Sequence, residues 1–257
     1  MHKNLTSLEI WEGVWEEEVP EDYIRKIVEY YKTTLLFNKI KRKIESHFSK
    51  MENLNVIELG AGEGIFSLLL GLEGARITCV DFSVKAIRRA KKIFDFYGVN
   101  ATFVEADIFN LPTSFLAKYD VSISVGLAEH FLGRKRDEAF MAHLSVLKPK
   151  GLAFVVVPNA RCFPYMIMKY LYEKFKGGWF LGAEFPISRR ELINIARCMP
   201  KVNEYEIFGG SFYRTFYDNL FVPARIILGK LFNRPTPKFL IYKIANYRPS
   251  IFDDYLG

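Results

Sequence analysis

Hydrophobic residues recur with two different spacings along the first 160 residues. Short apolar runs, bounded by polar residues or glycine, alternate with segments whose apolar positions repeat every three or four residues. The short runs predict strands at 55–59, 76–80, 102–105, 121–125 and 152–157. The other segments predict helices at 20–50, 65–72, 83–97 and 137–147. Strands that alternate with helices favour an α/β fold, a Rossmann-like doubly wound, mostly parallel sheet with helices on both faces.

This alternation ends near residue 158. Residues 159–187 contain an aromatic helix and a Gly-Gly-Trp turn, which predicts a helical lid insertion. In "SRRELINIARCM", Ser188 and Glu191 match a capping box at the start of a helix, and "VNEYEIFGG" predicts the next strand. Residues 212–257 carry two apolar helical pieces and no convincing final strand. We expect an N-terminal helical cap at 1–50, the sheet domain with its insertion at 51–212, and a C-terminal extension at 213–257.

The stretch "VIELGAGEG" joins the first predicted strand to the next helix through three glycines. Gly60 and Gly62 let the backbone approach a ligand closely, and Gly64 lets the following helix pack near the loop. A strand, a tight glycine turn and a helix start form a ligand site at the carboxyl edge of a parallel sheet. A tight turn without any ligand is the alternative for the loop taken alone.

Acidic residues follow at the ends of the next two strands. Asp81 is placed to accept hydrogen bonds from ribose hydroxyls, Phe82 to cover an adenine face, and Asp107 to accept from an adenine amino group. The glycine spacing is GxGxG, whereas the dinucleotide fingerprint is GxGxxG. Glu58 and Glu63 also place negative charge beside the loop. These features favour S-adenosylmethionine, which carries a sulfonium and an ammonium group, over a ligand with a pyrophosphate.

The motifs "VIELGAGEG", "VDFS", "EADIFNLP", "YDVSISVGLAEHF" and "LKPKGLAFVVVPN" resemble the successive motifs of class I S-adenosylmethionine-dependent methyltransferases. The resemblance covers about residues 50–160, and the chain departs from the family pattern after about residue 210. It implies the class I methyltransferase fold, S-adenosylmethionine as cofactor and S-adenosylhomocysteine as product. It places Glu58, Gly60, Ala61 and Gly62 at the methionine end, Asp81 at the ribose, Asp107 and Ile108 at the adenine, and Val125 and Gly126 beside the methyl donor.

The resemblance also implies that residues 1–50 form part of a lid, with Trp11 and Trp15 as lid or core residues. The acceptor should enter after the fourth strand, at "GLAEHF". There Glu129 could accept a hydrogen bond from an amine and His130 could take a proton near neutral pH. Asn159 is a further candidate hydrogen-bond acceptor. A structural role for Glu129 and His130 is the alternative.

The same position lacks two signatures of nucleic-acid methyltransferases. The Asp/Asn-Pro-Pro-Tyr/Phe sequence of many enzymes that methylate amino groups is replaced by "SVGLAEHF". No cysteine lies near it, which argues against the cysteine route to carbon 5 of pyrimidines.

The net charge of +7 lies entirely after residue 158. Residues 1–158 carry 21 Lys and Arg against 21 Asp and Glu, whereas residues 159–257 carry 15 against 8 and hold 21 of the 40 aromatic residues. This combination favours an RNA substrate methylated at a base nitrogen. Three alternatives remain for this segment: it forms an apolar lid over a small-molecule or lipid-like substrate, the acceptor is a protein side chain, or the chain is a non-catalytic cofactor-binding subunit. Candidate contacts are Lys169, Lys174, Lys176, Arg189, Arg190 and Arg214 for phosphates, and Tyr165, Trp179, Phe180, Tyr213 and Phe216 for bases.

Composition also predicts the redox state, the cellular compartment and the kind of source organism. Cys79, Cys162 and Cys198 are far apart and form no CxxC pair, so we expect neither a disulfide framework nor a metal site. No long uncharged apolar run and no leader pattern occur, which predicts a cytoplasmic protein. The chain contains no glutamine, which indicates a thermophilic source because thermolabile amides are avoided there.

Overall fold

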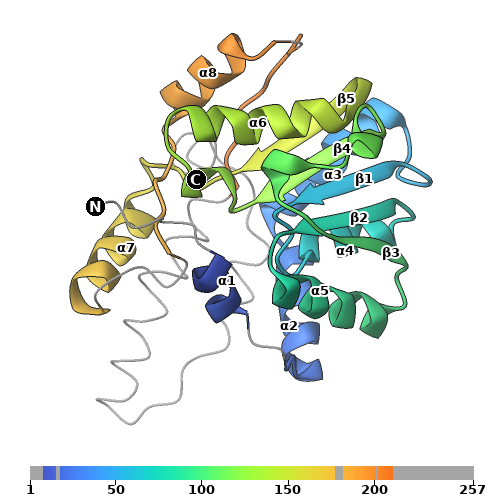
Figure 1. Ribbon diagram of the computed structural model, residues 1–257, viewed down its shortest axis with the longest axis horizontal. Coiled ribbons are helices and arrows are strands. Elements are labelled where there is room, and N and C mark those ends of the chain that lie inside the picture. Colours follow the sequence, from blue (N-terminus) through green and yellow to red (C-terminus); the bar gives the residue numbers. More distant parts are fainter. Residues whose placement is uncertain (1–7, 16–17, 177–181, 201, 211–257) are drawn as a thin grey trace.

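The computed structural model describes residues 8–15, 18–176, 182–200 and 202–210 (Figure 1). Their strands form one all-parallel sheet with the order β3-β2-β1-β4-β5. The strands are β1 (Asn55–Leu59), β2 (Arg76–Asp81), β3 (Ala101–Glu105), β4 (Tyr119–Val125) and β5 (Leu147–Val156). The helices are α1 (Leu8–Val14), α2 (Glu21–Lys32), α3 (Leu35–Phe48), α4 (Ile65–Leu72), α5 (Val84–Tyr97), α6 (Arg134–Val146), α7 (Phe163–Lys176) and α8 (Arg189–Cys198), with 3₁₀ turns η1 (Ile108–Asn110), η2 (Thr113–Phe115) and η3 (Ala128–His130).

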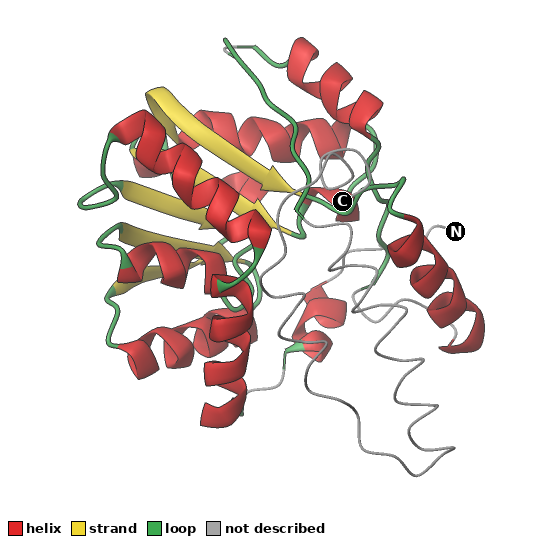
Figure 2. Cartoon of the chain, turned by 180° about the vertical axis from the view of Figure 1, so that it is seen from behind, coloured by secondary structure: helices red, strands yellow, loops and turns green. Residues whose placement is uncertain are grey.

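Two apolar clusters hold helices against opposite faces of the sheet (Figures 1 and 2). Val56 of β1 belongs to the cluster that includes buried residues of α2 to α5. Its neighbour Ile57 points to the other face and belongs to the cluster that includes buried residues of α6. This alternation along β1 follows from the pleat of a strand buried on both sides. The predicted doubly wound α/β fold is confirmed.

The strand order reverses between β1 and β4. From β1 the chain proceeds outward to β2 and β3, and then crosses back to β4 on the other side of β1. The loops after β1 and β4 therefore diverge at their carboxyl ends. Open α/β sheets bind ligands in the crevice at such a point.

The sequence predicts one helix over residues 20–50, and this prediction is wrong in one respect: the structure has two helices there, α2 and α3. Thr33 Oγ1 donates to the Tyr30 carbonyl at 2.9 Å, and Thr34 Oγ1 donates to the Tyr31 carbonyl at 2.7 Å. Thr34 Oγ1 also accepts from the backbone N–H of Phe37 at 3.2 Å, so this residue is the N-cap of α3. The two hydroxyls satisfy the backbone groups that a helix break exposes.

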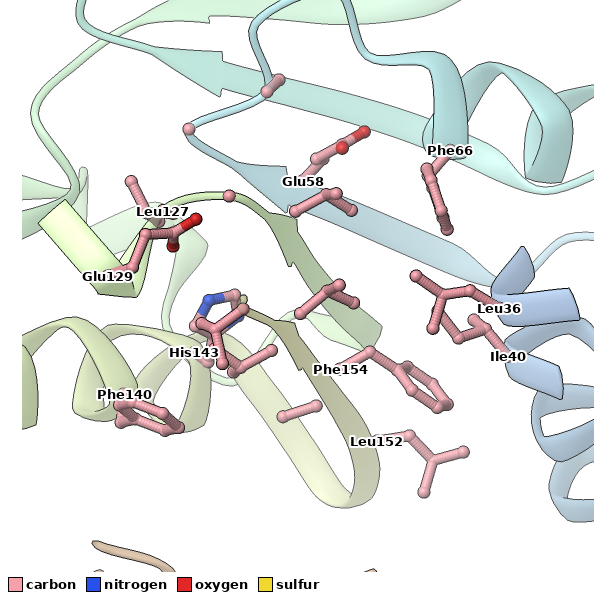
Figure 3. Close-up of a pocket in the computed structure, with 18 of the residues that line it drawn as sticks. Leu36, Ile40, Glu58, Phe66, Leu127, Glu129, Phe140, His143, Leu152 and Phe154 are labelled. Atoms are coloured by element: carbon pink, nitrogen blue, oxygen red, sulfur yellow. The ribbon is translucent and has the colours of Figure 1, made fainter. Parts of the chain in front are cut away.

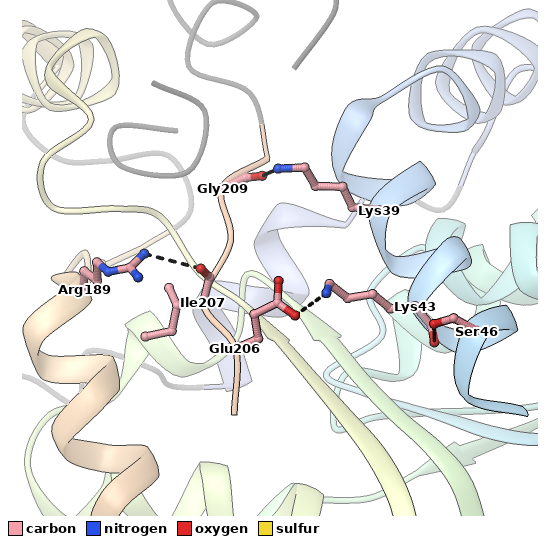
Figure 4. A network of polar contacts seen from close by, with 7 residues as sticks. All are labelled: Lys39, Lys43, Ser46, Arg189, Glu206, Ile207 and Gly209. Atoms are coloured by element: carbon pink, nitrogen blue, oxygen red, sulfur yellow. Dashed lines mark hydrogen bonds and ion pairs between the residues drawn. The ribbon is translucent and has the colours of Figure 1, made fainter. Parts of the chain in front are cut away.

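The strand predicted at 202–210 is also wrong. Side chains bind this segment instead of a neighbouring strand (Figure 4). Lys39 Nζ donates to the Gly209 carbonyl at 3.1 Å, Arg189 donates to the Ile207 carbonyl at 3.3 Å, and Lys43 forms an ion pair with Glu206. With its carbonyls bound in this way, the segment runs between α3 and α8 as extended coil.

The insertion after β5 is helical, as its aromatic pattern predicts. After α7 the chain returns alongside the end of β5, where Ile187 N–H donates to the Pro158 carbonyl at 2.9 Å. Ser188 Oγ then accepts from the Glu191 N–H at 3.2 Å, which confirms the predicted cap of α8. The Glu191 carboxylate pairs with Arg136 instead of closing the capping box. Of the helices that the structure describes, not one has the length and apolar character needed to cross a membrane.

Candidate active site

The three glycines of the β1–α4 loop all have backbone angles that L side chains rarely adopt. Their φ values are 65° at Gly60, 52° at Gly62 and 64° at Gly64. A Cβ at Gly60 would lie 2.6 Å from the side chain of Leu127, and one at Gly62 would lie 2.9 Å from the ring of Trp15. Glycine is therefore required here both by backbone conformation and by the side chains that cross the loop.

Glu58 lies at the end of β1, beneath this loop, with 3% of its surface exposed. Its Oε2 accepts a hydrogen bond from the backbone N–H of Ser67 at 3.2 Å. Burial raises the pKa of the Glu58 carboxyl to about 7, although the Ser67 hydrogen bonds oppose the shift. A buried carboxyl with this pKa becomes fully ionised at neutral pH only when a positive charge lies near it.

Glu63 does not supply free negative charge to the loop. Its carboxylate accepts hydrogen bonds from Tyr23 Oη at 2.9 Å and from Arg89 Nε at 2.5 Å. Both Glu63 and Arg89 are largely buried in this ion pair. Of the two glutamates beside the loop, Glu58 is therefore the one whose negative charge favours a cationic ligand.

Asp81 connects two loops at the end of β2. Its Oδ2 accepts from the Gly62 N–H and its Oδ1 from the Ser83 N–H, each at 2.9 Å. Burial raises the pKa of the Asp81 carboxyl, and these hydrogen bonds oppose the shift. Ser83 caps α5, as predicted from the sequence. The carboxylate thus holds the glycine loop against the start of α5, and Phe82 lies beside it, half-buried in the same cleft.

The remaining cofactor candidates lie at the carboxyl ends of β3 and β4. The Asp107 carboxylate is exposed and accepts from the Phe109 N–H at 3.0 Å, which caps η1, and Ile108 is buried. Gly126 N–H donates to the Val156 carbonyl at 3.0 Å at the end of β4. One cleft is lined by all of the predicted cofactor residues: Glu58, Gly60, Ala61, Gly62, Asp81, Phe82, Asp107, Ile108, Val125 and Gly126.

The acceptor candidates line the same cleft. Glu129 and His130 form the 3₁₀ turn after β4, and Tyr165 comes from α7. Asn159 has a local structural role, because its Oδ1 accepts from the Arg161 N–H at 2.9 Å. The other predicted substrate residues, Trp179, Tyr213 and Arg214, lie outside the described residues, as do Phe180 and Phe216.

Glu129 is almost completely enclosed. It is 1% exposed, and its Oε2 has no hydrogen-bond partner among the described residues. Burial raises the pKa of the Glu129 carboxyl to about 8. In Figure 3 the carboxylate points into the cleft from η3, close to Leu127. The same cleft continues past β5, where Leu36 and Phe154 line it (Figure 3).

His130 is also buried, and burial lowers its pKa. Its Nδ1 lies 2.9 Å from the Ala183 carbonyl, and its ring meets the ring of Trp11 edge-on with centroids 4.8 Å apart. Glu184 follows Ala183 and accepts a hydrogen bond from the hydroxyl of Tyr165. The insertion therefore places a second carboxylate next to the Glu129–His130 pair.

Sequence reasoning missed two functional or structural groups. Glu184 lies in the insertion, far from any motif, and no local signal marks it. His143 belongs to no sequence motif, but it is 1% exposed and its ring nitrogens lie 2.6 Å from Ser122 Oγ and 3.0 Å from Ser124 Oγ. The alternating serines of β4 are the signal that could have revealed a polar partner on the facing helix.

Two of the residues predicted to contact phosphate are bound within the chain. Lys169 is 7% exposed and pairs with Glu173 one turn along α7. Arg189 donates to the Ile207 carbonyl. Arg190 and Lys174 are exposed, and the ammonium of Lys174 lies 5.9 Å from the ring centre of Phe175. The described part of the basic segment thus offers fewer free cations than its composition suggests.

Comparisons with known proteins agree with this geometry. Residues 56–151 match the family model of a methyltransferase domain. Ubiquinone biosynthesis O-methyltransferase from Rickettsia bellii is 26% identical over 131 residues, which are 51% of this chain and 52% of that protein. EEF1A lysine methyltransferase 2 from Danio rerio is 25% identical, covering 71% of this chain and 78% of that protein. The chain thus spans about half the length of the ubiquinone relative.

A solved structure shows the same fold at low identity. Magnesium protoporphyrin IX methyltransferase from Synechocystis PCC 6803, with bound S-adenosylmethionine, aligns with a TM-score of 0.50. The alignment covers 76% of this chain and 80% of that protein, with 16% identity. The switch-point cleft and the matched domain define a methyltransferase of the Rossmann-like type. Residues 56–151 thus match a methyltransferase domain, and the relatives support a class I S-adenosylmethionine-dependent methyltransferase with S-adenosylmethionine as cofactor.

Proposed function

We propose that the protein transfers the methyl group of S-adenosylmethionine to a hydroxyl oxygen of a small, largely apolar metabolite. The observation that carries the proposal is the buried carboxylate of Glu129, which lines the same cleft as the glycine loop and whose Oε2 has no hydrogen-bond partner among the described residues. When bound, the cofactor would supply a methyl group on a sulfonium: the acceptor oxygen would bond to the methyl carbon, the C–S electron pair would stay on sulfur, and the hydroxyl proton would leave to solvent. Glu129 and His130 form the polar end of the cleft, at which the acceptor hydroxyl is held.

The cofactor residues divide into three groups by their position. Glu58 lies beneath the glycine loop, where a carboxylate favours the ammonium of the methionine end. Asp81 lies at the end of β2, where each carboxylate oxygen retains a lone pair for a ribose hydroxyl besides its backbone hydrogen bond. Asp107 is exposed just after β3, and we assign its carboxylate to accept a hydrogen bond from the adenine amino group. The half-buried Phe82 supplies the apolar face for the base.

The surroundings of Glu129 favour a small acceptor over an RNA base. Trp11, which meets His130, and the neighbouring Leu127 and Phe131 line the cleft, so a mostly apolar molecule would bury its surface there. By their names, two relatives act on small molecules, in ubiquinone biosynthesis and at magnesium protoporphyrin IX, and one acts on a protein lysine. The RNA substrate that composition favours has no support from these comparisons, and the small-molecule alternative is the better one.

Cofactor binding is tested first, by calorimetry with purified protein. Asp81→Asn should weaken S-adenosylmethionine binding by roughly tenfold or more, because hydrogen bonds to a carboxylate contribute about 1.5–3 kcal/mol. Asp95→Asn, at an exposed position of α5, is the matched control and should bind as the wild type does. Unchanged affinity in Asp81→Asn, with circular dichroism showing an intact fold, would mean that the cofactor lies elsewhere.

The acceptor class is tested by label transfer. Methyl-labelled S-adenosylmethionine and the protein are added to a cell extract that lacks this protein, and the products are separated into RNA, protein, and organic-soluble or low-mass fractions. We expect the label in the organic-soluble or low-mass fraction. Label in RNA that ribonuclease removes, or label in protein, would overturn the small-molecule assignment while leaving methyl transfer itself established.

A further inference from the structure

Glu129, His130 and Glu184 form a compact cluster beside the cofactor loop. Each offers a ligand atom, and these atoms all lie within 4.8 Å of one another. All three side chains are buried, with 1%, 5% and 7% of their surface exposed. Atoms bound around one ion at about 2.1 Å lie roughly 3–4 Å apart. Small rotations of the two carboxylates are therefore enough to bring the three ligand atoms around one ion.

The ligand atoms are oriented by the groups behind them. His130 Nδ1 lies 2.9 Å from the Ala183 carbonyl, so an Nδ1–H donates there and leaves the lone pair on Nε2. The Tyr165 hydroxyl donates to Oε2 of Glu184, which leaves Oε1 for another partner. Outer hydrogen bonds of this kind, donated by a histidine to a carbonyl and by a hydroxyl to a carboxylate, accompany metal ligands in proteins.

An independent observation is the unpartnered oxygen of Glu129. Its Oε2 is buried and no described group binds it. Burying a carboxylate oxygen without a partner is costly, and a second carboxylate nearby adds repulsion. The neighbouring cations are engaged elsewhere, since Lys169 pairs with Glu173 and Arg136 pairs with Glu191. A cation bound between the two glutamates would satisfy the oxygen and balance their charge.

We propose that Glu129, His130 and Glu184 bind one divalent transition-metal ion, such as Zn²⁺ or Mn²⁺. Two carboxylates and one imidazole are ligands that these ions accept. Because the cluster lines the cleft, the remaining coordination positions of the ion face the space in which an acceptor binds. Three protein ligands with open positions are the arrangement of catalytic rather than structural metal sites.

The role of the ion rests on the proposed function. A divalent ion that binds the acceptor hydroxyl lowers the pKa of that hydroxyl, so that the oxygen is a better nucleophile when its proton leaves to solvent. The acceptor class is then a metabolite with an oxygen that can reach the ion, and a phenol or a vicinal diol fits best. Glu184 comes from the insertion, which ties metal binding to the segment that shapes the acceptor side of the cleft.

The test is metal binding by the full chain without any substrate. The protein is freed of metal by a chelator and titrated with Mn²⁺, with free Mn²⁺ measured by electron paramagnetic resonance. We expect one saturable site per chain that Zn²⁺ displaces. Glu184→Gln and Glu129→Gln should each weaken Mn²⁺ binding by roughly tenfold or more. Glu52→Gln, at an exposed position before β1 and outside the cluster, is the control and should bind Mn²⁺ as the wild type does.

The alternative is a proton shared by the two glutamates. It predicts no saturable Mn²⁺ site, and that result would overturn the proposal, as would equal binding by Glu184→Gln and the wild type. Tyr165→Phe provides a second variant if either glutamine variant fails to fold, and it should weaken binding because Glu184 loses its hydroxyl partner. Calorimetry with S-adenosylmethionine on the same samples separates a failure of the metal site from a failure of the proposed methyltransferase function. Retained cofactor binding without metal binding rejects only the metal site.

Discussion

His143 is a buried imidazole that is neutral because of its burial and that contacts two serines of β4. Its Nδ1 lies 2.6 Å from Ser122 Oγ and its Nε2 lies 3.0 Å from Ser124 Oγ. Burial lowers the pKa of His143 to about 3. The side chain therefore joins α6 to β4 through two hydrogen bonds, and burial keeps its ring uncharged.

Acid should destabilise the protein through His143. The ordinary histidine pKa of about 6.5 in the unfolded chain exceeds the folded value, so the unfolded state binds more protons between these values. The free energy of unfolding should fall below pH 6.5, by up to about 2 kcal/mol at pH 5 from this group. The measurement is urea unfolding at pH 7 and pH 5. His143→Gln should lose clearly less stability over this interval, and the exposed His47→Gln should behave as the wild type. Equal losses in His143→Gln and the wild type would contradict the assignment.

Glu58 shows the opposite linkage. Its folded pKa of about 7 lies above the ordinary value, so the folded state binds more protons between about pH 4.5 and 7. The cofactor ammonium favours the carboxylate, and binding should therefore release a proton below pH 7. Affinity for S-adenosylmethionine should decrease as the pH falls from 7 to 6, by at most about tenfold. Calorimetry in buffers of different ionisation enthalpy measures both quantities. Glu58→Gln should show no proton release, and a release that persists in this variant would place the proton on another group.

The residues of the candidate site differ in how far sequence could predict them. Glu58 lies near the end of one predicted strand, and Asp81 and Asp107 follow two others, and the geometry of a parallel sheet brings the carboxyl ends of its strands to one edge. Glu184 and His143 could not be found in this way. Their positions depend on how an insertion folds back and on which face of α6 meets β4, and local patterns do not specify either contact.

At the scale of elements, the break between α2 and α3 depends on one side chain. Thr34→Ala should lower the free energy of unfolding by about 1 kcal/mol, because the N–H of Phe37 loses its cap. Thr34→Ser keeps the hydroxyl and is the matched control. Urea unfolding of the three proteins tests this. A Thr34→Ala protein as stable as the wild type would show that packing, rather than capping, ends α2.

The elements that sequence predicted well are those whose apolar pattern is both local and repeated. β1 and α4 have the predicted bounds, and α5 begins after its predicted cap at Ser83. The helix at 20–50 was predicted as one because its apolar spacing continues across the threonines. The segment 202–210 has strand-like composition, but Lys39 and Arg189, which bind its carbonyls, lie far from it in sequence.

At the scale of the whole molecule, charge composition was a poor guide to the substrate. The excess of +7 lies after residue 158, yet in the described part of that segment Lys169 and Arg189 bind groups of the chain itself. An ion pair inside an insertion and a phosphate contact on its surface require the same residue types. Composition therefore could not distinguish a charged lid from a nucleic-acid surface.

The N-terminal helix α1 connects three parts of the cleft. The ring of Trp15 covers Gly62 of the glycine loop, and Trp11 meets His130 edge-on. Between them, Glu12 accepts a hydrogen bond from Ser83 Oγ at 2.7 Å at the start of α5. A segment that contacts both the cofactor loop and the acceptor side can transmit cofactor binding to the whole cleft.

Loosening α1 should therefore weaken cofactor binding without unfolding the sheet. Glu12→Ala removes the hydrogen bonds to Ser83 and to the Lys85 N–H, and a loss of about 1 kcal/mol corresponds to roughly fivefold weaker S-adenosylmethionine binding. Glu9→Ala, on the exposed side of the same helix, is the control and should bind as the wild type does. Tryptophan fluorescence should also change on cofactor addition, and the change should disappear in Trp15→Phe. If Glu12→Ala binds with full affinity, α1 covers the loop without contributing to the cofactor site.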